Sequence, residues 1–262
     1  MGNRFLRRAG AKLIVQKLSA KAVLERKLIC EGDRILIGSS GGKDSTVMAW
    51  ALSGLKRAAK INYELLALHV SNDFSDEVKK TVLAAHLEEW GIPYRELAVP
   101  VIGRLKEGRK MNCYWCSTQR RTELIKFAVE NGFNKIALGH HLDDIIETFF
   151  MNMTGKGVLS AMPIHLAYRK YPVSLIRPLG YLEEKQIIAC AAELDILGDV
   201  CTCAYGMNSG RREMRERIAV FTRNSGAVKR RILSALSSGS ADLLDGNSAE
   251  TDNSETDGNE TD

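Results

Sequence analysis

The sequence predicts an α/β fold with a doubly wound, mostly parallel sheet, an N-terminal helix and C-terminal helices. Short apolar runs of strand length alternate along the chain with longer segments of helical periodicity. Alternation of this kind produces parallel strands joined by right-handed crossover helices. A glycine-rich turn also joins the first strand to the following helix, which is the usual place of a ligand-binding loop in this fold class.

Each strand is predicted from a run rich in β-branched or other apolar residues. The first four runs are separated by helical segments, and the last two lie in a stretch punctuated by glycine and proline. The expected strands cover residues 35–37, 63–70, 94–99, 135–138, 164–168 and 173–177.

Helices are predicted where apolar residues recur three or four positions apart. The first of them interleaves apolar with basic residues and is therefore an amphipathic helix with a basic face. The expected helices cover residues 3–29, 45–55, 76–90, 117–129, 143–153, 183–194 and 211–223.

Charge is distributed unevenly along the 262 residues. The net charge is +5, but residues 241–262 contain eight acids and no base, so the first 240 residues carry +13. A body this basic favours a polyanionic partner such as RNA. We expect a basic amphipathic helix over 1–30, a catalytic domain over 31–235, and a disordered acidic tail over 236–262, which lacks the apolar content to repay ordering.

No apolar run approaches the ~18 residues of a membrane span. We therefore expect a cytoplasmic protein without a membrane partner. Six cysteines in such a chain argue against a disulfide framework and point to metal or redox chemistry.

The loop over residues 38–45 suits a phosphate. Its glycines let the backbone approach closely, a helix N-terminus directs N–H groups at an anion, and Lys43 adds positive charge. Spacing excludes a Walker A loop, because Ile37 and Asp44 stand where that loop needs Gly and Ser or Thr. A dinucleotide fingerprint is excluded because Ser40 replaces its second glycine.

Polar residues also follow two other predicted strands. Ligands bind beyond the carboxyl ends of parallel strands, so residues 39–45, 69–73 and 139–144 should converge.

The cysteines form two clusters in the sequence. Cys113 and Cys116 make a C-x-x-C on a loop expected to enter the helix at 117, and Cys201 and Cys203 follow much later. If the fold joins these segments, three or four thiolates meet. An iron–sulfur cluster, a zinc site and a redox dithiol all remain open. The cluster is favoured over zinc, because the one-residue gap between Cys201 and Cys203 is shorter than the usual zinc-knuckle spacing.

Residues 40–45, Ser-Gly-Gly-Lys-Asp-Ser, resemble the SGGxDS signature of the PP-loop (ATP pyrophosphatase) family, whose fold is adenine nucleotide alpha hydrolase-like. Together with the C-x-x-C, Arg120-Arg121, the Gly-His-His-Leu-Asp-Asp run at 139–144 and a late cysteine, residues 1–225 resemble the tRNA 2-thiocytidine synthetase (TtcA) family of the TtcA/TtuA tRNA thiolases. The absence of flanking zinc-finger cysteine pairs favours cytidine over uridine as substrate.

The resemblance implies a [4Fe–4S] cluster whose fourth iron carries the sulfur to be transferred. Its protein ligands would be Cys113, Cys116 and one late cysteine. Cys203 is preferred over Cys201, because its Cys-x-Tyr-Gly context resembles the Cys-Pro-Tyr of related thiolases.

The resemblance also implies an ATP-dependent tRNA sulfurtransferase. It would adenylate a pyrimidine, expected to be a cytidine of the anticodon loop, replace its 2-oxygen by sulfur and release AMP and pyrophosphate. The expected catalytic residues are Lys43, Asp44, Asp143 and Asp144, with Asp44 or Asp144 holding Mg²⁺. The expected nucleotide-binding residues are Ser39, Ser40, Gly41, Gly42, Lys43, Asp44, Ser45, His69, Val70 and Gly139, with His69 and Val70 beside the adenine.

Two other interpretations remain open. One is a PP-loop ligase of the lysidine or amide-forming type with a structural zinc. The other is a non-catalytic nucleotide- and RNA-binding protein that uses a cluster as a sensor. The expected partners are tRNA, ATP and a sulfur donor such as a cysteine desulfurase, and a homodimer is one option for the assembly.

Overall fold

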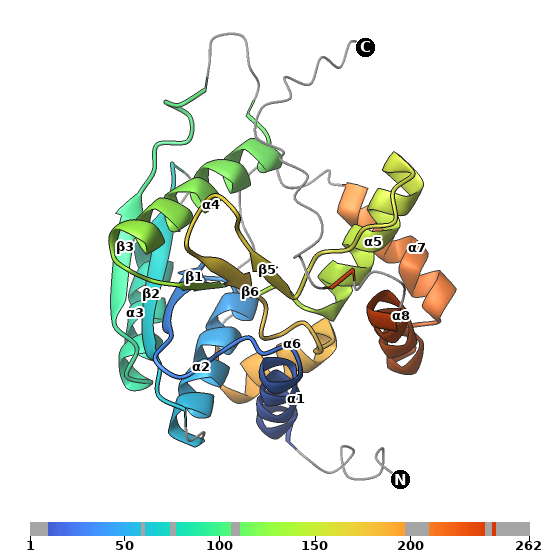
Figure 1. Ribbon diagram of the computed structural model, residues 1–262, viewed down its shortest axis with the longest axis horizontal. Helices are drawn as coiled ribbons and strands as arrows, with labels where there is room; N and C mark the ends of the chain where they lie inside the picture. Colours follow the sequence, from blue (N-terminus) through green and yellow to red (C-terminus); the bar gives the residue numbers. More distant parts are fainter. Residues whose placement is uncertain are drawn as a thin grey trace.

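A computed structural model describes residues 10–58, 61–73, 77–105, 111–196, 210–238 and 243–244, and it shows a six-stranded sheet between helices (Figure 1). The strand order is β3-β2-β1-β4-β6-β5, with every neighbouring pair parallel except β5 and β6. The predicted fold class is confirmed. The strands are β1 (Arg34–Ser39), β2 (Glu64–Ser71), β3 (Tyr94–Ala98), β4 (Lys135–Ala137), β5 (His165–Ala167) and β6 (Ser174–Ile176).

Both faces of the sheet are covered by helices. Ile35, Leu36 and Ile37 of β1 are fully buried, as a central parallel strand requires. Ile35 and Ile37 contribute to a core with α1, α2 and α6, whereas Leu36 packs with residues of α4 on the opposite face (Figure 1). The helices are α1 (Ala11–Glu25), α2 (Lys43–Ala58), α3 (Glu77–Glu89), α4 (Cys113–Glu130), α5 (Leu142–Lys156), α6 (Glu184–Glu193), α7 (Gly210–Thr222) and α8 (Gly226–Ser238).

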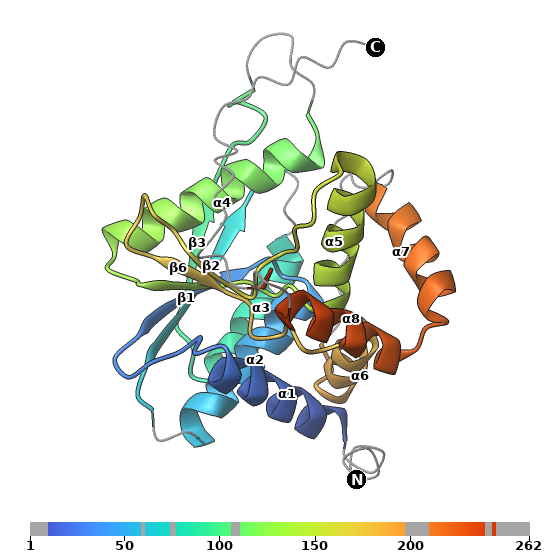
Figure 2. The same cartoon turned by 45° about the vertical axis from the view of Figure 1, so that its right-hand side comes forward.

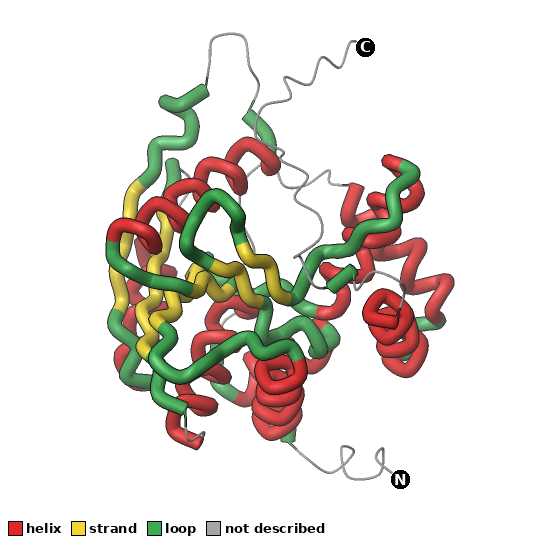
Figure 3. Tube along the Cα trace, in the orientation of Figure 1, coloured by secondary structure: helices red, strands yellow, loops and turns green. Residues whose placement is uncertain are grey.

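Helices α5, α7 and α8 pack together beside the sheet (Figure 2). Strands β2 and β3 lie on one side of β1, whereas β4 lies on its other side. The boundary between β1 and β4 is therefore the topological switch point, where ligands bind in open α/β sheets. The loops that follow β1, β2 and β4 therefore emerge at one edge of the sheet (Figure 3).

The predicted start of α4 is wrong. The helix begins at Cys113 rather than at 117, so the C-x-x-C forms its first turn instead of an entering loop. The cause is local, because the Asn112 side chain caps the helix by accepting a hydrogen bond from the Trp115 N–H at 2.8 Å.

The predicted start of the acidic tail at 236 is also wrong. Helix α8, which the sequence analysis did not anticipate, extends to Ser238, and its Leu236 is 4% exposed. Leu243 donates its N–H to the carbonyl of Leu236, and the buried Leu244 accepts from the N–H of Ile164. These hydrogen bonds and the buried side chains of Leu236 and Leu244 place both residues in the folded structure, past the proposed boundary. The predicted disorder over 245–262 and the predicted helix over 3–9 lie outside the described residues.

Candidate functional site

The loop between β1 and α2 closes on its own side chains. The Ser40 N–H donates to Ser45 Oγ at 3.2 Å, and Ser45 Oγ donates to the Gly42 carbonyl at 3.0 Å. Gly41 has a φ of +81°, in the left-handed region that favours glycine. The loop is thus a preformed turn at the N-terminus of α2, where the helix dipole favours a phosphate.

Gly139, just after β4, touches this loop. A Cβ built on Gly139 would lie 2.8 Å from the Ser45 nitrogen and 3.0 Å from the Asp44 carbonyl carbon. Both neighbours are backbone atoms, which cannot rotate away. The predicted convergence of residues 39–45 and 139–144 is therefore observed, and only glycine fits where the two segments meet.

Lys43 is held by two carboxylates. Its Nζ donates to Asp44 Oδ2 at 3.1 Å and to Glu184 Oε1, at the start of α6, at 3.2 Å. Burial lowers the pKa of Lys43, but Asp44 and Glu184 more than offset that effect, so the pKa is raised and the side chain stays charged. Asp44 Oδ1 is buried without a hydrogen-bond partner among the described residues, which leaves one hard oxygen available at the loop.

The end of β2 lies beside the loop. His69 is 6% exposed, and its Nδ1 is 2.9 Å from the carbonyl oxygen of Ser39. Val70 is buried as well, so this strand end presents little side-chain surface to a ligand. Its proposed place beside an adenine remains a prediction. Three residues after His69, the Asn72 amide donates to the sulfur of Cys116 at 3.3 Å.

Asp144 belongs to the N-terminus of α5. Its Oδ2 accepts from the N–H of His141, the N-cap residue, at 3.0 Å, and its Oδ1 lies 3.5 Å from Arg211 Nη1 on α7. Asp144 therefore faces both the loop after β4 and the basic helix α7.

Asp143 joins three helices. Its Oδ2 accepts from the backbone N–H of Glu184 at 2.7 Å, and its Oδ1 accepts from Lys229 Nζ of α8 at 2.5 Å. Burial raises the pKa of Asp143, but Lys229 and the Glu184 N–H outweigh burial, so the pKa lies below its ordinary value of 3.8. Both carboxylate oxygens are thus engaged in holding α6 and α8 against α5.

Lys229→Met should lower the free energy of unfolding by about 3 kcal/mol at pH 7, because it leaves a buried carboxylate without its cation while keeping the apolar stem. Asp143 has a depressed pKa in the folded state, so its contribution exists above pH 3.8 and is lost as the pH falls through the folded-state pKa. Urea denaturation at pH 7 and at about pH 3, below the ordinary pKa of 3.8, should show a smaller difference in unfolding free energy between wild type and variant at the lower pH.

Lys21→Met provides the matched control for that measurement. Lys21 forms an exposed pair with Glu25 at 3.7 Å on α1, so its removal should cost under about 0.5 kcal/mol at either pH. A loss for Lys229→Met no larger than that of the control would contradict the role assigned to the Asp143 pair.

A network of charges that the sequence analysis missed surrounds the loop. Arg215 of α7 binds the buried Glu147 of α5 through two contacts, at 2.7 Å and 3.4 Å, and lies 3.4 Å from Glu184. Burial raises the pKa of Glu147, and Arg215 offsets that only in part. The available signal was Glu147 itself, an acid between the apolar pairs Ile145-Ile146 and Phe149-Phe150 on α5.

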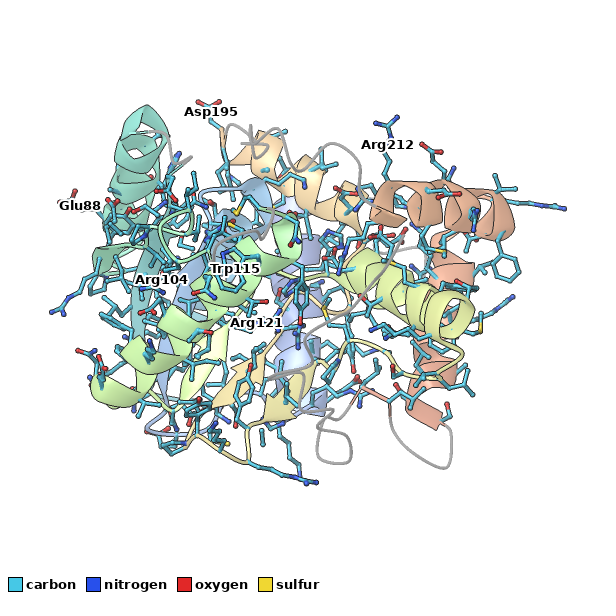
Figure 4. The ribbon with its side chains drawn as sticks, turned by 90° about the horizontal axis from the view of Figure 1, so that it is seen from above. Glu88, Arg104, Trp115, Arg121, Asp195 and Arg212 are labelled. Atoms are coloured by element: carbon cyan, nitrogen blue, oxygen red, sulfur yellow. The ribbon has the colours of Figure 1, made fainter. Side chains whose placement is uncertain are left out.

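Cys116 lies at the same edge of the sheet as the loop. Cys113 and Cys116 are three residues apart in the first turn of α4, which places them on one face of the helix. The indole N–H of Trp115 donates to the Val101 carbonyl at 3.2 Å and fixes this turn (Figure 4). The Asn72 amide donates a hydrogen bond to the Cys116 sulfur, and cysteine sulfur is a donor that fits a thiophilic metal or cluster.

The other cysteines do not complete a metal site within the described residues. Within the part of the chain that the structure describes, no three His, Cys, Asp or Glu side chains lie close enough to hold a metal ion. The side chain of Cys113 and the whole of Cys201 and Cys203 lie outside the described residues. Cys30 is exposed, and burial raises the pKa of Cys190 to about 12, so that thiol is inert.

Residues 14–197 match the family model of the PP-loop domain. The fold, the loop and this match together define a PP-loop protein, as the Ser-Gly-Gly-Lys-Asp-Ser motif predicts. None of the described helices is both long and apolar enough to cross a membrane.

Several curated relatives carry the name tRNA-cytidine(32) 2-sulfurtransferase. The protein from Geobacter metallireducens is 36% identical, covering 82% of this chain and 86% of its own length. The protein from Syntrophotalea carbinolica is 37% identical, covering 77% of this chain and 78% of its own. The chain therefore belongs to the tRNA-cytidine(32) 2-sulfurtransferase (TtcA) family, which confirms the resemblance seen in the motifs.

A solved structure extends the similarity. The U34-tRNA thiolase NcsA from Methanococcus maripaludis, determined with its [4Fe-4S] cluster, superposes with a TM-score of 0.69. It is 26% identical to this chain, and the match covers 84% of this chain and 76% of the thiolase.

Proposed function

We propose that this protein is an ATP-dependent tRNA sulfurtransferase that replaces the 2-oxygen of a cytidine by sulfur, at position 32 as in the names of its relatives. The observation that carries the proposal is the Asn72–Cys116 contact of 3.3 Å. It brings the cysteine turn of α4 to the strand edge from which the phosphate loop emerges, so nucleotide and sulfur chemistry share one site.

ATP activates the base, because a carbonyl oxygen is a poor leaving group. The cytidine 2-oxygen attacks the α-phosphorus, pyrophosphate leaves, and sulfur then displaces AMP from the adenylated carbon. Residues 40–45 cradle the pyrophosphate, and Lys43 moves from its carboxylate partners to the phosphates and offsets the developing charge. Asp44, whose Oδ1 lacks a partner among the described residues, or Asp144 would hold Mg²⁺.

A [4Fe–4S] cluster, when bound, supplies a coordination site for the sulfur to be transferred. Cys113, Cys116 and Cys203 would hold it. The thiol chemistry and the Asn72 amide support this assignment at Cys116.

Asp143 acts as a positioning residue, because the Glu184 N–H and Lys229 already engage both of its oxygens. Asp144 remains the catalytic or Mg²⁺-binding carboxylate. His69 and Val70 border the adenine from the end of β2.

A sulfur donor such as a cysteine desulfurase, a homodimeric assembly and a cytoplasmic location are parts of the same proposal. Residues 31–235 act as the catalytic unit together with α1. The helix α1 belongs to the core of that unit, because its Val15 and Ala22 are fully buried.

An anticodon stem-loop RNA tests the function directly. Protein purified without oxygen should convert the target cytidine to 2-thiocytidine in the presence of ATP, Mg²⁺ and sulfide, with one AMP formed per thiolated base. Nucleoside mass spectrometry and AMP quantification measure the two products. The matched control is the same RNA with uridine at the target position, which should remain unmodified. AMP formation with an amine adduct and no sulfur would instead identify a ligase.

A further inference from the structure

A buried arginine follows β6, two strands away from β1, the strand that leads into the phosphate loop. Arg177 follows β6 directly, is 5% exposed, and donates from Nη1 to the Pro163 carbonyl. Its Nε has no hydrogen-bond partner within the described residues, and none of the described carboxylates forms an ion pair with it. Burial, reinforced by Arg121, lowers the pKa of Arg177 to about 10. A guanidinium in this position calls for an anion.

A buried histidine lies beside Arg177 without neutralising it. The Leu138 N–H donates to the Ile176 carbonyl at 3.0 Å, which brings the end of β4 and the residues after it alongside Arg177. His140 follows there, and its Nδ1 is buried without a partner among the described residues. Burial, and then the nearby Arg177, Arg211 and Arg121, hold the pKa of His140 well below its ordinary range. The ring is neutral and has a free nitrogen.

Three arginines from three different elements therefore contribute positive charge near His140. Arg121 comes from α4, Arg177 from the end of β6 and Arg211 from α7, and their effects meet at His140. The carboxylate that faces them is Asp144, 3.5 Å from Arg211. Figure 4 shows Arg121 near the middle of this face, whereas Arg212 points away from α7 into solvent. These three cations and one carboxylate leave a net positive charge around His140.

We propose that Arg177, His140, Arg121 and Arg211 form an anion pocket that binds a phosphodiester of the RNA strand next to the target base. The proposal rests on the proposed function. The phosphates of ATP already have the loop after β1, with its own cation Lys43. The new pocket lies further along the sheet, beyond β4, and Arg121 is exposed on α4, where a strand too large to enter the core can reach it.

Holding that phosphate fixes the flipped nucleotide. A nucleotide that leaves the stack needs its backbone anchored before its base can be aligned with the α-phosphate of ATP. A neutral His140 suits this role, because one ring N–H can donate to a phosphate oxygen without a further charge being buried.

The test is binding of wild-type and variant protein to the anticodon stem-loop over a range of salt concentrations. Arg121→Gln and Arg177→Gln should each weaken RNA binding about 10-fold and reduce the slope of log K against log salt by about one. ATP affinity, measured separately by calorimetry, should stay within about twofold. Arg121 is exposed, so its variant keeps the test valid if Arg177→Gln fails to fold.

Arg95→Gln is the matched control, since Arg95 is exposed on β3 at the other end of the sheet. If Arg121→Gln behaves like this control, the pocket is not an RNA site. Weakened ATP binding with unchanged RNA binding would assign the pocket to the nucleotide and also overturn the proposal. If wild-type protein thiolates RNA and both variants bind RNA as tightly as wild type, the anion pocket is refuted and the proposed function stands. Wild type that neither binds nor modifies RNA refutes the proposed function itself.

Discussion

Replacing Gly139 by alanine should weaken ATP binding about 10- to 100-fold and destabilise the protein by about 1 to 3 kcal/mol. The added Cβ would lie 2.8 Å from the Ser45 nitrogen and 3.0 Å from the Asp44 carbonyl carbon. Real Cβ atoms do not approach so closely, so the segment after β4 or the first turn of α2 must move. The first turn of α2 is the part of the loop that carries the phosphate site, which is why binding suffers together with stability.

Gly155→Ala is the control for that substitution. Gly155 lies within α5, and a Cβ built on it meets no atom within 4 Å. Alanine is the better helix former, so this variant should gain about 0.5 to 1 kcal/mol and bind ATP normally. Calorimetric titration with ATP and thermal unfolding of all three proteins measure both quantities. If Gly139→Ala matched wild type in both, the contact with the loop would have no role in shaping the site.

Cys116→Ala should remove the metal centre and reduce thiolation to background. Protein purified without oxygen should contain about four iron and four sulfide per chain and absorb in the visible range. Loss of one thiolate should release nearly all of this iron, because two protein ligands cannot retain the cluster through purification. ATP affinity should change less than about twofold, since Cys116 belongs to α4 and not to the phosphate loop.

Three further variants complete the experiment. Cys30 is exposed and lies outside α4, so Cys30→Ala should keep its full iron content. Cys203→Ala should lose the iron and Cys201→Ala should retain it, which would identify the third ligand. Zinc without iron in the wild-type protein would favour the adenylating ligase, and iron retained in Cys116→Ala would refute the proposed ligand set.

Most features predicted correctly from the sequence depend on short stretches of neighbouring residues. The run at 35–37 is buried on both faces in β1, and the Ser-Gly-Gly-Lys-Asp-Ser motif forms the turn into α2 with Gly41 at positive φ. Two errors also have local causes. Asn112 is a typical N-cap three residues before Trp115, and its signal was overlooked, so the start of α4 was placed too late. Leu233 and Leu236 give α8 an apolar face that the tail boundary disregarded.

By itself, the sequence determined the order of the strands and of every described helix except α8, the phosphate loop, the cysteine pair and the family. Each of these depends on residues that are neighbours in the chain, where periodicity, glycine conformation and spacing act directly. Only the tertiary structure decided that Lys43 binds Glu184, that Lys229 binds Asp143, and that Arg177 is buried beside His140. These contacts join residues that are 37 to 141 positions apart in the numbering. The packing of helices against the sheet selects them, because charge and polarity along the chain do not specify which distant group will lie opposite.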